Sequence, residues 1–160
     1  MRRPSNVLVR RARQADAADL TAILHDTFES TWRPQISAAA AQAFLTEDRP
    51  AAYVAKQGLD FQVAEWESVV VGLVHWQDDF VNALHVRSDH TRNGIATRLM
   101  DRAEAEIARS GLAAVRLETD TFNTTSQVFY AARGYREADR YPDEEWNSDL
   151  TTILLVKPLV

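Results

Sequence analysis

A glycine between a strand and a helix is the position in this sequence with the clearest chemical consequence. Residues 80–86 read FVNALHV, a short apolar run that predicts a buried strand. From Ile95 to Ile107 apolar side chains recur at every fourth position, which is typical of an amphipathic helix. Gly94 stands between the two, so free backbone N–H groups and the positive end of the helix dipole point at whatever lies above the strand. Such a turn favours phosphate, although every strand-to-helix turn exposes similar amides.

Other classes of site lack their signatures. The five glycines fit neither G-x-G-x-x-G nor G-x-x-x-x-G-K-[ST], which argues against a dinucleotide fold and a P-loop. The nucleophile elbow of serine hydrolases is missing. The four histidines show no metal-ligand spacing, and each is expected to be a surface or packed residue, so we expect no metal. The absence of cysteine excludes disulfides, thiolate metal sites and thiol nucleophiles.

The residues around Gly94 resemble the pyrophosphate loop of a known family. Residues 91–96 read TRNGIA and are similar to the [QR]-x-x-G-x-[GA] loop of GNAT-type N-acetyltransferases, which bind acetyl-coenzyme A. Thr91 replaces the usual Gln or Arg, while Arg92 beside it offers positive charge. In that family backbone amides hold most of the phosphate. The resemblance implies that the cofactor is bound by Thr91, Arg92, Asn93, Gly94, Ile95, Ala96 and Thr97.

The resemblance covers nearly the whole chain. Leu84, His85 and Val86 resemble the strand end that receives the thioester, with the N–H of Val86 at the position that stabilises the oxyanion. Asn123 and Tyr130, followed by Gly-Tyr, resemble the family element N-x-x-A-x-x-x-Y-x-x-x-G-[FY], although Ser126 replaces the alanine. The resemblance therefore adds Leu84, His85, Val86 and Asn123 to the expected cofactor-binding residues.

The spacing within this element is most similar to one subgroup of the family. Leu117 and Glu118 come shortly before Asn123, and Tyr130 comes seven residues after it, as in the protein N-terminal acetyltransferases that modify ribosomal proteins. Members that act on small molecules share many of these positions. The acceptor implied by the resemblance is therefore either a small cationic amine or a protein or peptide amine.

Acetyl transfer to an amine assigns expected roles to two side chains. The resemblance implies direct attack in a ternary complex, for which the acceptor ammonium must first lose a proton. Glu118 matches the base of the ribosomal-protein subgroup and points to the face opposite Val115 and Leu117, although it also fits an exposed strand carboxylate. Tyr130 matches the general acid that protonates the leaving thiolate, although a tyrosine in an amphipathic helix also fits a packing role.

An acidic loop near the C-terminus is the expected wall of the acceptor site. Residues 143–147 place three consecutive carboxylates beside Trp146, and Trp32 lies in a break between two predicted helices. We expect Trp32, Glu145 and Trp146 to contact the acceptor, because carboxylates attract an ammonium and an indole face holds it by cation–π attraction. A solvated turn with one packing tryptophan fits the loop equally well.

A different functional class remains to be weighed. A non-catalytic acyl-coenzyme A sensor or interaction domain would keep the fold without turnover. The presence of Glu118, Asn123 and Tyr130 together argues against it.

Composition limits the partners. The chain has 160 residues, which is about one domain, and we expect residues 1–160 to form a single N-acetyltransferase domain. The net charge of -5, without a basic block, makes nucleic acid an improbable partner. No apolar run is long enough to cross a bilayer and no signal-peptide core follows the N-terminus, so we expect a cytoplasmic protein without a membrane partner. A homodimer is left open.

The elements expected to position these residues form an α/β (α+β) fold. Strands are predicted over residues 7–9, 61–66, 69–77, 80–86, 113–120, 135–141 and 151–156. Helices are predicted over residues 16–28, 37–47, 95–110 and 123–133, with Asp48 to Pro50 ending the second. The helix after Gly94 makes strands 80–86 and 113–120 a parallel pair. The resemblance implies a mixed, mostly antiparallel sheet of about seven strands with this pair splayed at its centre and about four helices.

Overall fold

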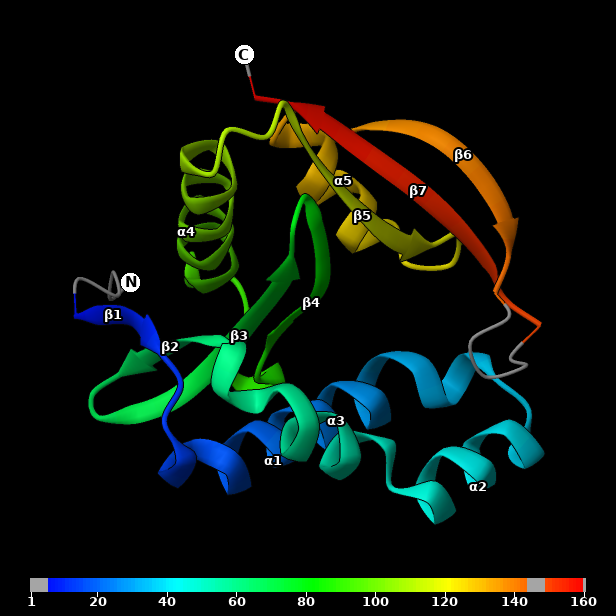
Figure 1. The fold of residues 1–160 in the computed structure, drawn as a ribbon. Coiled ribbons are helices and arrows are strands. Elements are labelled where there is room, and N and C mark those ends of the chain that lie inside the picture. The colour runs from blue at the N-terminus through cyan, green and yellow to red at the C-terminus, as the bar shows by residue number, and fades with distance from the viewer. Residues whose placement is uncertain (1–5, 144–148, 160) are drawn as a thin grey trace.

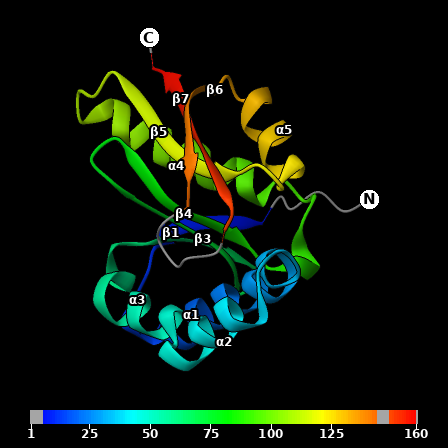
Figure 2. The same ribbon diagram turned by 90° about the vertical axis from the view of Figure 1, so that its right-hand side faces the viewer.

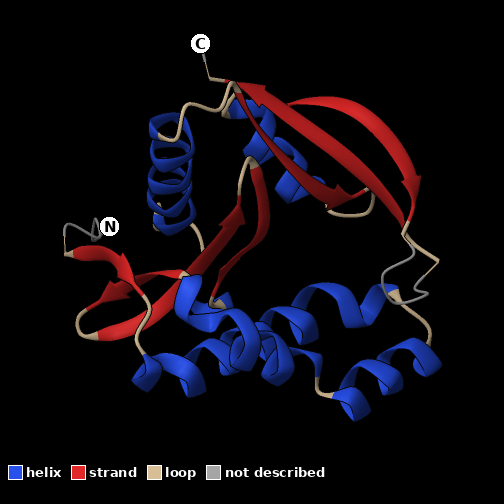
Figure 3. Cartoon of the chain, in the orientation of Figure 1, coloured by secondary structure: helices blue, strands red, loops and turns tan. Residues whose placement is uncertain are grey.

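The computed structural model describes residues 6–143 and 149–159 and contains one sheet with helices on both faces (Figures 1 and 3). The strands are β1 (Val7–Arg11), β2 (Gln62–Trp66), β3 (Val69–Gln77), β4 (Phe80–Val86), β5 (Ala114–Asp120), β6 (Arg136–Pro142) and β7 (Thr151–Pro158). The α-helices are α1 (Ala17–Thr27), α2 (Ala38–Glu47), α3 (Arg49–Gln57), α4 (Ile95–Arg109) and α5 (Thr124–Ala132). A π-helical turn (Phe28–Trp32) and a 3-10 turn (Arg33–Gln35) join α1 to α2.

The sheet is mixed, with the strand order β1-β2-β3-β4-β5-β7-β6. All neighbours are antiparallel except β4 and β5, which are parallel and joined through α4, so the predicted parallel pair is confirmed. β4 and β5 pair only where both begin, at Phe80 with Arg116 and Val81 with Leu117. Beyond this point the two strands separate, and the sheet is split between β4 and β5 as a V (Figure 1).

The closed end of the V is held by a backbone bond and an ion pair. The N–H of Arg116 donates to the Asp79 carbonyl at 2.8 Å, and its guanidinium contacts both carboxylate oxygens of Asp79 at 2.9 Å. Paired guanidinium–carboxylate bonds fix both the distance and the orientation of their partners. The split therefore opens in one direction only, toward the carboxyl ends of β4 and β5.

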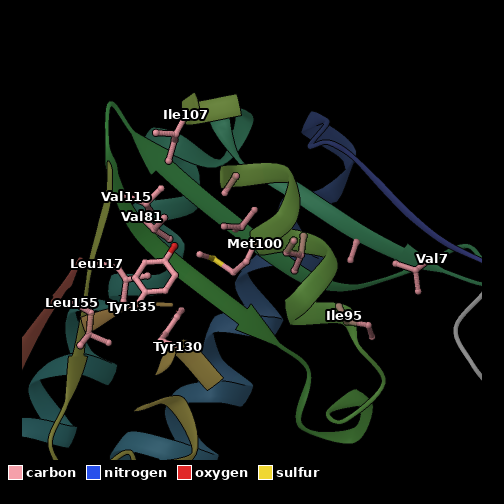
Figure 4. Close-up of a cluster of buried hydrophobic side chains, with 14 of the residues drawn as sticks. Val7, Val81, Ile95, Met100, Ile107, Val115, Leu117, Tyr130, Tyr135 and Leu155 are labelled. Carbon is pink, nitrogen blue, oxygen red and sulfur yellow. The ribbon is translucent and has the colours of Figure 1, made fainter. Parts of the chain in front are cut away.

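Helices α4 and α5 lie on one side of the sheet and α1 and α3 on the other (Figure 2), and a separate hydrophobic cluster lies under each pair. The larger cluster lies under α4 and α5 and joins both halves of the sheet, with Met100 of α4 on the side of Val81 and Val115 and with Ile95 at the other end of the cluster (Figure 4). The smaller cluster packs α1 and α3 against the other face of the sheet, and all of its buried residues come before β5 in the sequence. The face of β5, β7 and β6 turned away from α5 thus has no share in that cluster, which leaves room for a cleft.

The predicted strands are all present, and the structure adds one helix to the four that were predicted. Residues 48–50 do end α2, because Asp48 adopts a left-handed conformation with φ of 45°. The same residue begins α3, since its carboxylate accepts a hydrogen bond from the N–H of Ala51. Pro50 is tolerated in the first turn of a helix, where the missing N–H has no partner to lose. Asp-Arg-Pro is therefore a junction between two helices.

Candidate active site

The split in the sheet forms a cleft with a volume of about 1370 Å³, lined by both halves of the molecule. It is larger than a typical site for one small ligand, so it has room for two substrates. Of the residues predicted to bind the cofactor, all but one line this cleft: Leu84, His85, Val86, Thr91, Arg92, Gly94, Ile95, Ala96, Thr97 and Asn123. Glu118, Tyr130 and Trp32 also line it.

Asn93 is the exception. Its side-chain amide donates to the carbonyl of His90 at 3.2 Å, so it braces the loop from inside. Its predicted part in binding is then limited to the backbone.

The start of α4 forms one end of the cleft and lacks a side-chain cap. The helices α2, α3 and α5 begin with the capping side chains of Ser37, Asp48 and Asn123, whereas Gly94 at the start of α4 has none. The first N–H groups of α4 therefore have no side chain to accept their hydrogen bonds. Gly94 has φ of 75°, which turns the chain sharply into the helix and which glycine adopts without strain. This is suitable geometry for binding a phosphate group.

Backbone N–H groups of β4 face the middle of the cleft. The N–H of Arg87 donates to the carbonyl of Val71 in β3 at 2.8 Å. N–H groups alternate in direction along a strand, so those of Val86 and Leu84 point away from β3 and toward β5. Since β5 has already diverged beyond Val81, its backbone does not accept from them. These two groups can donate hydrogen bonds to an extended ligand or to an oxyanion.

Tyr130 lies beside them on α5. Its ring is 8% exposed and packs edge-on against Tyr135, with the two ring centroids 5.4 Å apart. Burial raises the pKa of its hydroxyl above the ordinary value, so the group is protonated at neutral pH. The hydroxyl makes no hydrogen bond to any residue of the described ranges 6–143 and 149–159, which keeps its proton available to a ligand. Asn123 caps this same helix, because its side-chain oxygen accepts from the N–H of Ser126 at 3.1 Å.

Glu118 lies on the opposite wall, on the face of β5 away from the core. Its carboxylate is exposed and accepts a hydrogen bond from the hydroxyl of Tyr141 on β6. Burial first, and then this bond, raise the pKa of Tyr141 to about 12, so that tyrosine stays protonated. Glu118 is thus held in place while remaining open to solvent.

Trp32 and Asp120 come from opposite halves of the molecule and meet at one end of the cleft. The indole N–H of Trp32 donates to the Asp120 carboxylate at 2.9 Å. Burial raises the pKa of Asp120, the bond from Trp32 lowers it, and the nearby Asp143 carboxylate raises it further. Asp120 was not predicted to belong to the site, because its contact with Trp32 spans 88 positions of sequence and no local pattern reports it. Glu145 and Trp146, which were predicted to line this wall, lie outside the described residues.

His85 completes this end. Its Nδ1 lies 2.9 Å from the hydroxyl of Thr27, and its ring centroid lies 5.8 Å from that of Trp32. Burial lowers the pKa of His85 to about 4, so its imidazole is neutral at neutral pH. The sequence predicted His85 only as a cofactor contact, whereas its side chain lies on the side of Thr27 and Trp32.

These features divide the cleft into an end formed by the start of α4, which has no side-chain cap, a strand whose N–H groups face away from β3, and an acidic, aromatic end. Across the described part of the chain, no group of three or more His, Asp or Glu side chains is arranged to hold a metal ion. None of the described helices is long and apolar enough to cross a membrane.

Comparison with known sequences points in one direction. A family model described as the acetyltransferase (GNAT) family matches residues 17–135. A blasticidin-S acetyltransferase from Streptomyces morookaense is 36% identical over 90 residues, which cover 56% of this chain and 64% of that enzyme. An IAA acetyltransferase from Azospirillum brasilense is 30% identical over 112 residues, which cover 66% of this chain and 72% of that protein. The match therefore spans just under two thirds of the Streptomyces relative.

Solved structures share the fold at lower identity. A protein from Rhodopseudomonas palustris described as a GCN5-related N-acetyltransferase superposes with a TM-score of 0.80 at 22% identity, covering 96% of both chains. The PaiA N-acetyltransferase from Thermoplasma acidophilum, solved in complex with coenzyme A, gives 0.76 at 17% identity and covers 96% of this chain and 99% of that one. At these identities the likeness concerns the fold.

Proposed function

Because the chain belongs to the GNAT acetyltransferase family, we propose that it transfers an acetyl group from acetyl-coenzyme A to a primary amine by direct attack in a ternary complex. The observation that carries the proposal is the uncapped start of α4 in the same cleft as the N–H groups of β4 that face away from β3. Pyrophosphate fits the first feature, and the pantetheine arm and thioester fit the second. The cofactor-bound relative from Thermoplasma acidophilum supports this use of the fold.

Two side chains carry out the proton transfers that the reaction requires. The acceptor enters as an ammonium and must lose one proton before its nitrogen can attack. Glu118 receives that proton, through water because the carboxylate is exposed. As the C–S bond breaks, Tyr130 protonates the departing thiolate from its place on α5 in the same cleft, and the N–H of Val86 stabilises the oxyanion that precedes this step.

The acceptor end of the cleft suits a cationic amine. Asp120 and Asp143 supply negative charge there, and Trp32 supplies an indole face. The acceptor is then a small cationic amine or the amine of a peptide, and the relative named for blasticidin S makes that compound a rational first probe.

Thiol release measured with a chromogenic disulfide tests the proposal. The chain has no cysteine, so every thiol detected comes from coenzyme A. The wild type should release thiol from acetyl-coenzyme A in the presence of blasticidin S, of another amine from a panel, or of an N-terminal peptide, with intersecting initial-velocity lines as a ternary complex requires. A Gly94→Trp variant should lose affinity for coenzyme A, because the indole occupies the space beside the start of α4.

Each failure has a distinct meaning. Binding of coenzyme A without turnover for any amine would favour a non-catalytic acyl-coenzyme A sensor. Undiminished affinity in a folded Gly94→Trp variant would place the cofactor elsewhere.

A further inference from the structure

A chain of hydrogen bonds runs from α1 to the imidazole of His85. The hydroxyl of Thr27 donates to the carbonyl of Leu24 at 3.2 Å, and its oxygen lies 2.9 Å from Nδ1 of His85. Thr27 is 8% exposed, so water has little access to compete for these bonds. A hydroxyl has only one hydrogen to donate.

Because Thr27 has only one hydrogen to donate, one tautomer of the neutral His85 imidazole is favoured. If Thr27 donates to Leu24, its oxygen must accept from Nδ1–H of His85, and both bonds are made. If Thr27 donates to Nδ1, the bond to Leu24 is lost. The first arrangement makes more hydrogen bonds, and buried polar groups are generally paired. It leaves Nε2 without a hydrogen, with its lone pair facing the cleft that His85 lines.

The surroundings of His85 are those of an amine site. Its neighbours in β4, Leu84 and Val86, offer the N–H groups assigned to the thioester, while alternation along the strand places the His85 side chain on the other face, toward α1. Trp32 stands 5.8 Å from the ring of His85 and is tied to Asp120. An amine that enters past Asp120 and Trp32 therefore meets Nε2 next to the acetyl carbonyl.

We propose that Nε2 of His85 accepts a hydrogen bond from the attacking nitrogen and then takes its second proton. This inference rests on the proposed acetyl transfer. The amine, already relieved of one proton, forms the N–C bond to the thioester carbon and gives a tetrahedral intermediate with a positively charged nitrogen. That nitrogen passes a proton to Nε2 while the C–S bond breaks and Tyr130 protonates sulfur. The imidazolium then returns its proton to the Tyr130 phenolate through solvent, so both groups are restored.

The role explains why a neutral imidazole suits this position. The nitrogen of the intermediate is much more acidic than the free ammonium, so a weak base such as a neutral imidazole is sufficient for the second transfer. A cationic imidazole would instead repel the incoming ammonium. Thr27 acts through His85, as a positioning residue that fixes the tautomer.

The tautomer can be measured without an acceptor. Long-range proton–nitrogen NMR spectra of the ¹⁵N-histidine protein at neutral pH distinguish the two forms, and His85 is assigned by comparison with His85→Gln. We expect the Nδ1–H form in the wild type and in Thr27→Ser, which keeps the hydroxyl, and a shift toward the Nε2–H form in Thr27→Val. An Nε2–H tautomer in the wild type overturns the inference.

Kinetics with the amine that the wild type acetylates supply the second test. His85→Gln should lower kcat by roughly 10²-fold, the scale of general base catalysis, with the affinity for acetyl-coenzyme A unchanged. Thr27→Val should lower kcat by about tenfold, as expected for the loss of one hydrogen bond, and Thr27→Ser should restore it. His25→Gln is the matched control, because His25 lies on α1 like Thr27 but does not line the cleft.

The two proposals fail separately. A wild type that acetylates no amine overturns the proposed function, whatever tautomer is found. An active wild type together with undiminished kcat in His85→Gln overturns the role of His85 and leaves acetyl transfer intact.

Discussion

The ring and the hydroxyl of Tyr130 have different expected roles, since the ring packs in the core and the hydroxyl is proposed to donate a proton. The ring packs against Tyr135, while the hydroxyl has no partner among the residues the structure describes. Replacing Tyr130 by Phe should therefore preserve the fold and the affinity for coenzyme A and lower kcat, by ~10²-fold on the scale of general acid catalysis. Steady-state turnover and calorimetry measure the two quantities. An unchanged kcat, with pre-steady-state kinetics showing that chemistry limits the rate, would return Tyr130 to a packing role.

Asp120 provides a test of acceptor charge. An Asp120→Asn variant keeps an oxygen for the Trp32 N–H and removes the negative charge. The KM for a cationic amine should rise about tenfold at low ionic strength, with a smaller rise at high salt, and the KM for acetyl-coenzyme A should stay constant. Asp19→Asn removes the same charge from an exposed position outside the cleft and serves as the control. Equal effects of the two substitutions would mean that only net charge matters.

The sequence predicted the residues whose roles depend on local spacing. Gly94 was found from its place between a strand and a helix, and Glu118, Asn123 and Tyr130 were found through the family resemblance; the structure places all of them around one cleft. Their chemical roles stay predictions. Asp120 and the bonds between Thr27 and His85 could not be found, because each depends on a contact between α1 or the following turn and a strand far along the chain.

At the scale of elements, Glu104 ties four segments together. Its carboxylate on α4 accepts hydrogen bonds from Arg133 after α5, from Tyr135 before β6 and from Lys157 on β7, at 3.1, 2.8 and 2.7 Å. Burial by itself raises the pKa of Glu104, but these three donors outweigh it and lower the pKa overall. The same cluster supports Tyr130, because Tyr135 packs against it.

Glu104→Ala should lower the free energy of unfolding by about 3 kcal/mol, because it leaves the partly buried Lys157 without its carboxylate and Arg133 with Asp101 alone. Glu106→Ala, which breaks the exposed pair with Arg109 on the same helix, should change it by less than about 1 kcal/mol. Urea denaturation measures both. Similar losses in the two variants would show that helix α4 is sensitive to any charge removal rather than to this cluster.

Element prediction succeeded where one local signal decided the structure. The Glu67-Ser68 turn is confirmed as a hairpin, with φ of 52° and 67°, and Ser37 caps α2 as predicted. Helix α3 was missed because Asp48 is both a helix end and a helix start. The separation of β4 from β5 came from the family resemblance, since no periodicity in either strand indicates it.

For the molecule as a whole, two histidines connect stability to pH. Burial lowers the pKa of His85 to about 4 and lowers that of His75, from an ordinary value of 6.5. In that interval the unfolded chain binds more protons than the folded one, so stability is lost as pH falls from about 6.5 toward 4. Between pH 6.5 and 4 the free energy of unfolding of His85→Gln should fall by about 1 to 2 kcal/mol less than that of the wild type, allowing for the partial exposure of the ring. Thermal melts at pH 7 and 4.5 measure it, and an unaltered difference between them would contradict the lowered pKa.

Other predictions about the whole molecule concern its surroundings. The single domain over residues 1–160, the cytoplasmic location and the homodimer that was left open stay predictions. The fold itself, with seven strands and one parallel pair, agrees with the prediction in class and in the order of the strands along the chain.

The two sides of the cleft differ in how freely their sequence can change. The strands and α4 that border the cleft contribute to the larger hydrophobic cluster, whereas α2 adds no residue to either cluster and buries only Ala40 and Ala41. Substitutions at the exposed positions of α2 should therefore leave the free energy of unfolding almost constant. Phe44, the described α2 residue that lines the cleft, is instead half-buried and stacks on Phe28 with the two ring centroids 3.8 Å apart. Phe44 is therefore the position on α2 where a substitution should change the shape of the cleft and the free energy of unfolding together.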